Sequence, residues 1–372
     1  MKVVINGRFL EKPHTGIGQY TLNLVREMAR LKPKTQFVVV VPTKVTLRGL
    51  GKNVKLKVLP ERRLPSAGMR KTWWEQVLLP RFMREAGAEV CFFPYPSNPW
   101  AKDFYGAGRR VVVVVHDCIP WVDKRYVNGG LSRMYHYMTR KAVKLADKVM
   151  TVSGVSKKEI VEVCGVKASK VVVAWNDAAE VYKNKDVDGG ALKRLGLEKK
   201  KFLLYVGGYD VRKNVRYLVR EYEKFMECVD EDLPLVLAGG KALFGKLYKS
   251  FDEAFGGNLV KTGFLKEESL AALYGGCLAF VNFSEKEGFN IPIVEAANMG
   301  APMILSDIEV HREVAGGRAR LVEAEKSGAG AKAFSEMMRP EVRRNYVKQS
   351  KALAKKFSWK ESAKKVLNVL FS

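Results

Sequence analysis

Paired cysteines, long apolar runs and an N-terminal leader pattern are all missing from this sequence. The five cysteines are scattered without a C-x-x-C pair, so neither a disulfide framework nor a zinc site is predicted, and buried reduced thiols are expected. No apolar run approaches the roughly 20 residues of a membrane-spanning helix. The start, MKVVINGRFL, is typical of a strand rather than a signal peptide. These absences favour a cytoplasmic protein.

Acidic residues are also scarce relative to basic ones. The 372 residues include 65 Lys and Arg against 39 Asp and Glu, a formal net charge of +26. Residues 1–180 hold 32 basic and 14 acidic residues (net +18), and the remainder hold 33 and 25 (net +8). Such a field attracts polyanions or an anionic membrane surface. A nucleic-acid-binding protein is therefore one interpretation, and a lysine-rich surface that merely aids solubility is another.

Short apolar runs without alternation, typical of strands buried on both faces, recur between amphipathic segments. They are KVVI, FVVVVP, VCFFPYP, RRVVVVVHD, KVMTVS, KVVVAW, FLLYVGG, LPLVLAGG, LAFVNFS and APMILSD. Intervening segments such as GQYTLNLVREMARL have helical spacing. A polar, glycine-containing break at residues 176–200 separates two series of runs. The sequence therefore predicts two doubly wound α/β domains joined near residue 180, with ligands binding in the cleft that they face.

Two basic residues follow the run FLLYVGG. Arg212 and Lys213 come just after the strand end and its glycines, at the start of a helix that begins near Asn214. Glycines let the backbone approach a ligand, and two cations beside free helix N–H groups suit a dianion such as a diphosphate. An exposed basic turn is the alternative.

Two glutamates lie in the stretch SEKEGFNIPIVEAANMG, which follows the run LAFVNFS. The proline and the final glycine predict a helix over residues 291–299. Glu287 then lies in a turn, where it can accept hydrogen bonds from sugar hydroxyls, and Glu295 lies one turn into the helix, where it can accept them from a ribose. An anion at the helix start would face the backbone N–H groups of Phe289, Asn290 and Ile291. Two surface charges would explain the spacing but not this context.

The first half has weaker signals. PHTGIGQYTLNL places Gly16 and Gly18 ahead of a helix, as a plain loop would also do. VVVVVHDCIP puts His116 and Asp117 at a strand end, where functional groups of parallel sheets collect, although a lone histidine is more often structural. MRKTWWEQVLLPRFMRE, residues 69–85, combines basic residues with two tryptophans. It is either an interfacial helix on anionic lipid or an ordinary packing segment.

Ten motifs in order now resemble family 4 glycosyltransferases, which are retaining, metal-independent enzymes of the GT-B fold. They are GIGQYTLNL, FFPYPSNP, VVHDCIP, ADKVMTVSGVSKKEI, LLYVGGYDVRKN, LVLAGG, VKTGFLKEESLAALYGGC, SEKEGFNIPIVEA, APMILSDIEVHREVAGG and FSWKESAKKVL. The resemblance spans nearly the whole chain. It implies two Rossmann-like domains facing a cleft. Residues 1–180 would form the acceptor-side domain, and a final helix at about 358–372 would cross back to this domain. Residues 181–357 would bind the donor.

The resemblance also implies roles for single positions. Lys213 and Arg212 match the basic pair that neutralises the donor diphosphate, Glu287 matches the glutamate at the donor sugar, and Glu295 matches the one at the ribose. His116 matches the histidine beside the transferred sugar. Further donor-binding positions are Gly16, Ile17, Gly18, Gly207, Phe264 (beside the base), Gly288, Phe289, Asn290 and Ile291. Two positions depart from the family pattern: Gly208 stands where many members have arginine, and Asn290 where glycine is common.

The expected activity is transfer of a hexose, of the mannose or glucose type, from a nucleoside diphosphate (GDP, UDP or ADP) to a hydroxyl of a glycan or lipid-linked acceptor. No cofactor, metal or nucleic acid is expected, and contact with the inner membrane face is a second expectation. The Asp-x-Asp triplets at residues 186–188 and 230–232 are interpreted as solvated loops rather than metal ligands. An epimerase or phosphorylase on the same fold is the nearest alternative.

Overall fold

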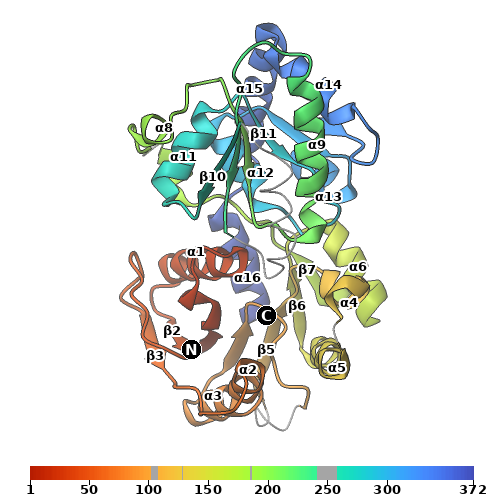
Figure 1. Cartoon of the computed structure of the whole chain (residues 1–372). Helices are drawn as coiled ribbons and strands as arrows, with labels where there is room; N and C mark the ends of the chain where they lie inside the picture. Colours follow the sequence, from red (N-terminus) through yellow and green to blue (C-terminus); the bar gives the residue numbers. More distant parts are fainter. Residues whose placement is uncertain (102–107, 128, 185–186, 241–257) are drawn as a thin grey trace. The chain divides into compact units, whose positions relative to one another are not determined.

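The computed structural model describes residues 1–101, 108–127, 129–184, 187–240 and 258–372. The chain divides into two compact units, Met1–Asn176 with Ser358–Ser372, and Asp177–Phe357 (Figure 1). Each unit is a parallel sheet with helices packed against it, so the predicted α/β class and the doubly wound arrangement are confirmed.

The first unit is built on a seven-stranded parallel sheet in the order β3-β2-β1-β4-β5-β6-β7. Its central strands are rich in valine and buried on both faces, because β-branched side chains fit a pleated surface that helices cover. The strands are β1 (Lys2–Asn6), β2 (Gln36–Val41), β3 (Val54–Val58), β4 (Val90–Phe93), β5 (Arg110–Val114), β6 (Lys148–Thr151) and β7 (Val171–Val173).

The helices of this unit include the last one of the chain. They are α1 (Gly16–Leu31), α2 (Ala67–Trp73), α3 (Leu79–Glu85), α4 (Ile119–Val122), α5 (Gly129–Leu145), α6 (Gly154–Cys164) and α16 (Trp359–Phe371). Helices α1 and α16 lie side by side (Figure 1), with the rings of Tyr20 and Trp359 6.0 Å apart. Ser362 donates a hydrogen bond to the Trp175 carbonyl. The implied return of the final helix to the first domain is therefore observed.

Residues 69–85 do not form one continuous α-helix. Between α2 and α3 the chain makes a π-helical turn, η2 (Trp74–Leu78). Trp74 is fully buried in the core, where its indole N–H donates to the Leu59 carbonyl at 2.7 Å, whereas Trp73 is partly exposed. The interpretation of Trp74 as an interfacial side chain is therefore wrong, because its ring is already packed inside the unit.

The second unit has a six-stranded parallel sheet in the order β10-β9-β8-β11-β12-β13. In this order the first strand of the unit is central, and the connections reverse direction between β8 and β11, the place where such sheets bind ligands. The strands are β8 (Leu203–Val206), β9 (Leu235–Ala238), β10 (Leu259–Gly263), β11 (Ala279–Asn282), β12 (Met303–Ser306) and β13 (Arg320–Val322).

Helices α9 and α14 lie side by side in the second unit (Figure 1), and the Phe334 ring of α14 contacts Phe225 and Phe283. The polar segment at residues 176–200, which separates the two series of apolar runs, contains two short helices. The helices are α7 (Glu180–Asn184), α8 (Ala191–Arg194), α9 (Val215–Met226), α11 (Glu267–Gly276), α12 (Ile291–Met299), α13 (Glu309–Ala315), α14 (Ala329–Met338) and α15 (Pro340–Ala354).

All five cysteines are free thiols, as expected, but they are not all buried. Cys228 is exposed after α9, and the other four lie in the interior. Among the described residues, no helix has both the length and the apolar character needed to cross a bilayer.

Candidate active site

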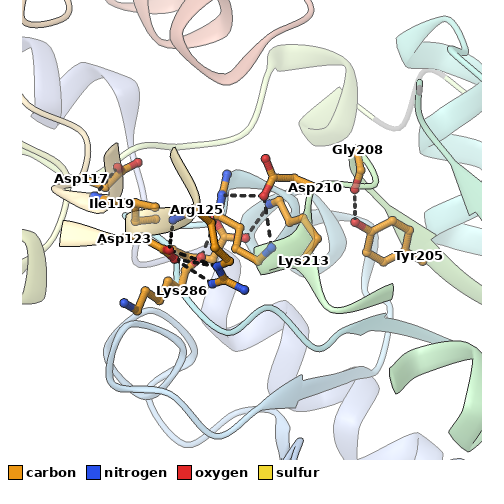
Figure 2. Close-up of polar contacts among 11 residues, drawn as sticks. Asp117, Ile119, Asp123, Arg125, Tyr205, Gly208, Asp210, Lys213 and Lys286 are labelled. Atoms are coloured by element: carbon orange, nitrogen blue, oxygen red, sulfur yellow. Dashed lines mark hydrogen bonds and ion pairs between the residues drawn. The ribbon is translucent and has the colours of Figure 1, made fainter. Parts of the chain in front are cut away.

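The turn after β8 requires glycine. Gly207 has φ +154°, and a Cβ there would lie 2.8 Å from the Tyr205 hydroxyl. That hydroxyl donates a hydrogen bond of 2.6 Å to the Gly208 carbonyl (Figure 2). The buried Tyr205 side chain therefore holds the turn in place by this hydrogen bond. The turn lies at the carboxyl end of the central strand β8.

The two expected cations follow in a short 3₁₀-helix, η6 (Val211–Lys213), whose start is capped by Asp210. Arg212 Nη1 donates to Glu287 Oε2 at 2.7 Å and to the Lys286 carbonyl at 2.9 Å. Lys213 Nζ donates to Glu287 Oε1 at 2.5 Å. The structure thus brings together the basic pair and the first glutamate, residues more than 70 positions apart, in one ion cluster.

The Glu287 carboxylate is ionised in this cluster. Burial alone would raise its pKa, but the charges of Lys213 and Arg212 outweigh burial and lower the pKa to about 2. Only 6% of its side chain is exposed. Asp210 also lies 3.9 Å from Arg212, so two cations meet two carboxylates here. What the cluster offers an anionic ligand is therefore the N–H donors of Arg212 and Lys213 rather than an excess of positive charge.

Helix α12 begins beside this cluster with the bounds that the sequence predicts. Its N-cap, Asn290, is left-handed at φ +71°, the conformation that asparagine tolerates better than most residues. The N–H groups of Phe289, Asn290 and Ile291 have no acceptor among the residues that the structure describes. Unpaired N–H groups and the positive end of a helix dipole make an anion site.

A buried histidine that sequence reasoning missed supports this N-cap. His311 Nε2 lies 2.9 Å from Asn290 Nδ2, and Nδ1 lies 2.9 Å from the Ser306 carbonyl at the end of β12. Burial lowers the pKa of His311 to about 4, so the ring is neutral, with Nδ1 protonated and Nε2 accepting from Asn290. The only signal in the sequence was its place on the helix after APMILSD.

We expect Asn290→Ala to be less stable than Asn290→Gly by about 1 kcal/mol. Both variants lose the bond to His311. Alanine also pays the energetic cost of a left-handed backbone, and this cost is larger than the backbone entropy that glycine loses on folding. Urea unfolding of the two variants measures the difference. Equal stability would show that the N-cap relaxes its backbone when asparagine is removed.

Glu295 lies in the second turn of α12 and is almost fully buried. Its Oε2 accepts a hydrogen bond of 2.9 Å from the hydroxyl of Tyr274 in α11. Burial raises the pKa of Glu295 to about 7, although the Tyr274 bond opposes the shift. Oε1 has no hydrogen bond from the described part of the chain, so one carboxylate oxygen remains for a ligand.

Phe264 follows β10 and is 72% exposed. Its ring lies against Gly240, just after β9, where an added Cβ would be 2.1 Å from the ring. Gly240, the last residue of LVLAGG, therefore leaves room for an aromatic ring beyond the carboxyl end of β9, an arrangement suited to stacking on a base.

The candidate glycines of the first unit, Gly16 and Gly18, differ in how closely other atoms approach them. Gly16 and Ile17 are the first residues of α1, so the glycines lie within its first turn rather than in a loop ahead of it. Thr15 caps the helix by accepting from the Gly18 N–H at 3.2 Å. A Cβ at Gly18 would lie 2.4 Å from the Lys12 carbonyl, whereas Gly16 has open space around it. Gly18 is thus needed for packing, and Gly16 remains available to a ligand.

His116 follows β5, and one of its two ring nitrogens is already hydrogen-bonded. Nε2 lies 2.8 Å from the Pro94 carbonyl, which only a protonated nitrogen satisfies, and the Tyr20 ring packs edge-on at 4.8 Å. Burial lowers the pKa of His116 to about 4. The neutral ring then presents Nδ1 as an acceptor. Its neighbour Asp117 accepts from the Ile119 N–H at 3.0 Å at the start of α4 (Figure 2).

The two Asp-x-Asp triplets lie in connections between elements, and the structure describes three of their four aspartates. Asp186 lies outside the described residues, and Asp188 is paired with Arg194 and Ser269. Asp230 and Asp232 lie in the connection between α9 and β9. Among the described residues, no group of three or more His, Cys, Asp or Glu side chains is arranged to hold a metal ion.

Two protein-family models match the two halves of the chain. The family described as Glycosyltransferase Family 4 matches residues 14–176, and that described as Glycosyl transferases group 1 matches residues 192–364. The O-antigen chain mannosyltransferase B of Escherichia coli is 24% identical over 99% of both chains. The phosphatidyl-myo-inositol mannosyltransferase of Mycobacterium leprae is 26% identical over 66% of this chain and 68% of its own.

Solved structures show the same fold at low identity. Anabaena Alr3699/HepE in complex with UDP and glucose superposes with a TM-score of 0.75 at 14% identity, covering 100% of this chain and 99% of its own. WaaG, a glycosyltransferase involved in lipopolysaccharide biosynthesis, gives 0.74 at 12% identity over all of both chains. The chain belongs to the family 4 glycosyltransferases of GT-B fold. It is an enzyme that transfers sugars.

Proposed function

We propose that this enzyme transfers a hexose, of the mannose or glucose type, from a nucleoside diphosphate to an acceptor hydroxyl with retention at the anomeric carbon. The observation that carries the proposal is the ion cluster of Arg212, Lys213 and Glu287 beside the unpaired N–H groups that begin α12. The mannosyltransferase names of several relatives favour mannose as the sugar and glycan synthesis as the setting.

In this mechanism the donor diphosphate lies against the start of α12. The bond between the anomeric carbon and the phosphate oxygen breaks, and the negative charge that develops is stabilised by Lys213, Arg212 and the helix N–H groups, without a metal. The acceptor oxygen attacks the same face, and its proton passes to the departing diphosphate. No carboxylate acts as nucleophile.

Hydroxyl groups of the donor are bound by the two glutamates. Glu287, ionised at any pH well above 2, accepts from the sugar while its two cations face the phosphates. Glu295 Oε1 accepts from the ribose. On the family resemblance, His116 Nδ1 accepts from the transferred sugar, and the first turn of α1 binds phosphate. Since Gly208 replaces an arginine found in many members, Arg212 takes more of the diphosphate charge.

Thermal stabilisation tests the proposal and identifies the base. A ligand that binds only the native state raises the melting temperature, so one of GDP-mannose, UDP-glucose or ADP-glucose should raise it well beyond the others. Proton NMR of the product formed from that donor then gives the anomeric configuration. Inversion would refute retention, and a free epimer without a glycosylated acceptor would identify an epimerase instead.

We also propose peripheral membrane contact through the basic first unit and a lipid-linked or acidic acceptor. The excess of positive charge in residues 1–180 supports it. In liposome flotation, the protein should rise with vesicles rich in phosphatidylglycerol, lose that binding in high salt, and stay behind with neutral phosphatidylcholine. Absence from both vesicle fractions would contradict the proposal.

A further inference from the structure

The first unit has a buried carboxylate on an unusual backbone. Glu75 lies in the π-helical turn η2, and its side chain has no exposed surface. Single π-turns inserted in α-helices occur frequently at functional sites, because the extra residue redirects a side chain. Here the turn separates α2 from α3 and aims Glu75 at Tyr95, which follows β4.

The hydrogen bonds around Glu75 have a fixed direction. Tyr95 donates its hydroxyl proton to Glu75 Oε1 at 2.6 Å. Asn6 Nδ2 donates to the Tyr95 oxygen at 3.1 Å and to Ser97 Oγ at 2.8 Å, while its Oδ1 accepts from the Arg8 N–H at 3.0 Å. Because the Asn6 amide is held in one orientation, the Tyr95 proton must point at Glu75, and the network is complete on that side.

The other carboxylate oxygen has no such partner. Glu75 Oε2 is buried without a hydrogen bond from any described residue, and so are Gln76 Oε1 and Arg8 Nη1. Native proteins pair almost all buried polar atoms, and an unpaired carboxylate oxygen is among the least tolerated. Three such atoms around one turn indicate that the cluster is completed by a ligand.

The position of the cluster suits a ligand site. Asn6 is the last residue of β1, and Tyr95 follows β4, its neighbour in the sheet, so the cluster lies at the carboxyl edge where parallel sheets bind ligands. Lys71 borders it with a third of its side chain exposed. Lys71 Nζ lies 3.8 Å from Glu75 Oε1 and 5.2 Å from the centre of the Tyr135 ring. A flexible lysine can withdraw to admit a ligand.

We propose that Glu75 binds a hydroxyl group of a neutral sugar residue in the acceptor. A hydroxyl donates to Oε2, Lys71 donates to a second sugar oxygen, and the Tyr135 ring packs against the apolar face of the pyranose. A carboxylate oxygen only accepts hydrogen bonds, so a sugar hydroxyl can pair with Oε2 where the oxygen of a phosphate or carboxylate cannot. The inference rests on the proposed glycosyl transfer, because that reaction requires an acceptor.

Ligand-observed NMR titration of the full chain tests this, with methyl α-D-mannopyranoside and methyl α-D-glucopyranoside as probes. Glu75→Gln keeps the side-chain volume and the bond from Tyr95, but it puts an amide donor in place of Oε2. We expect the Kd of the better glycoside to rise at least tenfold, while the Kd of the stabilising nucleotide-sugar changes less than twofold. Mannose 6-phosphate should bind the wild type no more tightly than the neutral glycoside.

Glu85→Gln is the matched control, since it removes the same charge from an exposed carboxylate of α3 and should change neither Kd. If Glu75→Gln does not fold, Lys71→Met should still weaken the glycoside tenfold without affecting the nucleotide-sugar. An unchanged glycoside Kd in the folded variant, or no saturable glycoside binding to the wild type, would overturn the assignment. Failure of the proposed glycosyl transfer would give a different result. Glycoside binding would then persist, while nucleotide-sugar binding and sugar transfer would be absent.

Discussion

Lys213→Ala should lower kcat about 30- to 1,000-fold, corresponding to roughly 2–4 kcal/mol of lost transition-state stabilisation. The ammonium is held by Glu287 at 2.5 Å in a site with little solvent access, so it needs no rearrangement as charge develops on the diphosphate. Because this charge grows during bond cleavage, kcat and kcat/KM should fall together, with a smaller change in the donor KM.

The matched control for this prediction is Lys348→Ala, which removes the same charge from the exposed face of α15 and should leave both constants unchanged. Steady-state kinetics with the donor found by thermal stabilisation gives the comparison. Near-normal turnover of Lys213→Ala would remove the diphosphate assignment, provided that the unfolding midpoint shows a folded variant.

Glu295→Gln should stabilise the protein at pH 8 while weakening the donor. The pKa of Glu295 is about 7 instead of the ordinary 4.5, so the folded state retains a proton that the unfolded chain releases in this range. Stability therefore falls as the pH rises from 4.5 through 7, and the ionised carboxylate costs about 3 kcal/mol at pH 8. A neutral glutamine removes this cost at pH 8 and changes nothing near pH 4.

Donor binding should respond in the opposite sense. The ribose hydroxyls donate to a charged oxygen in the wild type, and the loss of such a bond should raise the Kd of the nucleotide-sugar about 10- to 100-fold. Urea unfolding at pH 4 and pH 8 and calorimetric titration of the donor give the two measurements. Glu341→Gln, on the exposed first turn of α15, is the control. A variant less stable at pH 8, or an unchanged donor Kd, would refute the role of Glu295.

The sequence predicted the central strands better than the edges of the sheets. Runs such as FVVVVP and LAFVNFS stand out because both faces are buried. Strands β3, β10 and β13 were missed, and all three are edge strands with partly exposed residues. An edge strand has fewer neighbours to pack against, so its sequence need not be continuously apolar.

The candidate site was predicted in its positions but not in its contacts. The proline and glycine signals predicted the bounds of α12, since both residues have local conformational requirements. The bonds from Arg212 and Lys213 to Glu287, and from Tyr274 to Glu295, join residues distant in sequence. No local pattern encodes such pairs, and the π-turn at Glu75 is equally invisible in helical spacing.

The place of α16 has a consequence for how the protein is made. The first unit is interrupted in sequence, because residues 177–357 intervene before the helix that packs on α1. During synthesis on the ribosome, the whole second unit emerges before the first receives its last helix, so the nascent first unit exposes the apolar surface that α16 will cover. Expression of residues 1–176 alone should therefore yield an aggregation-prone fragment, whereas residues 177–357 form an uninterrupted segment that can be produced by itself.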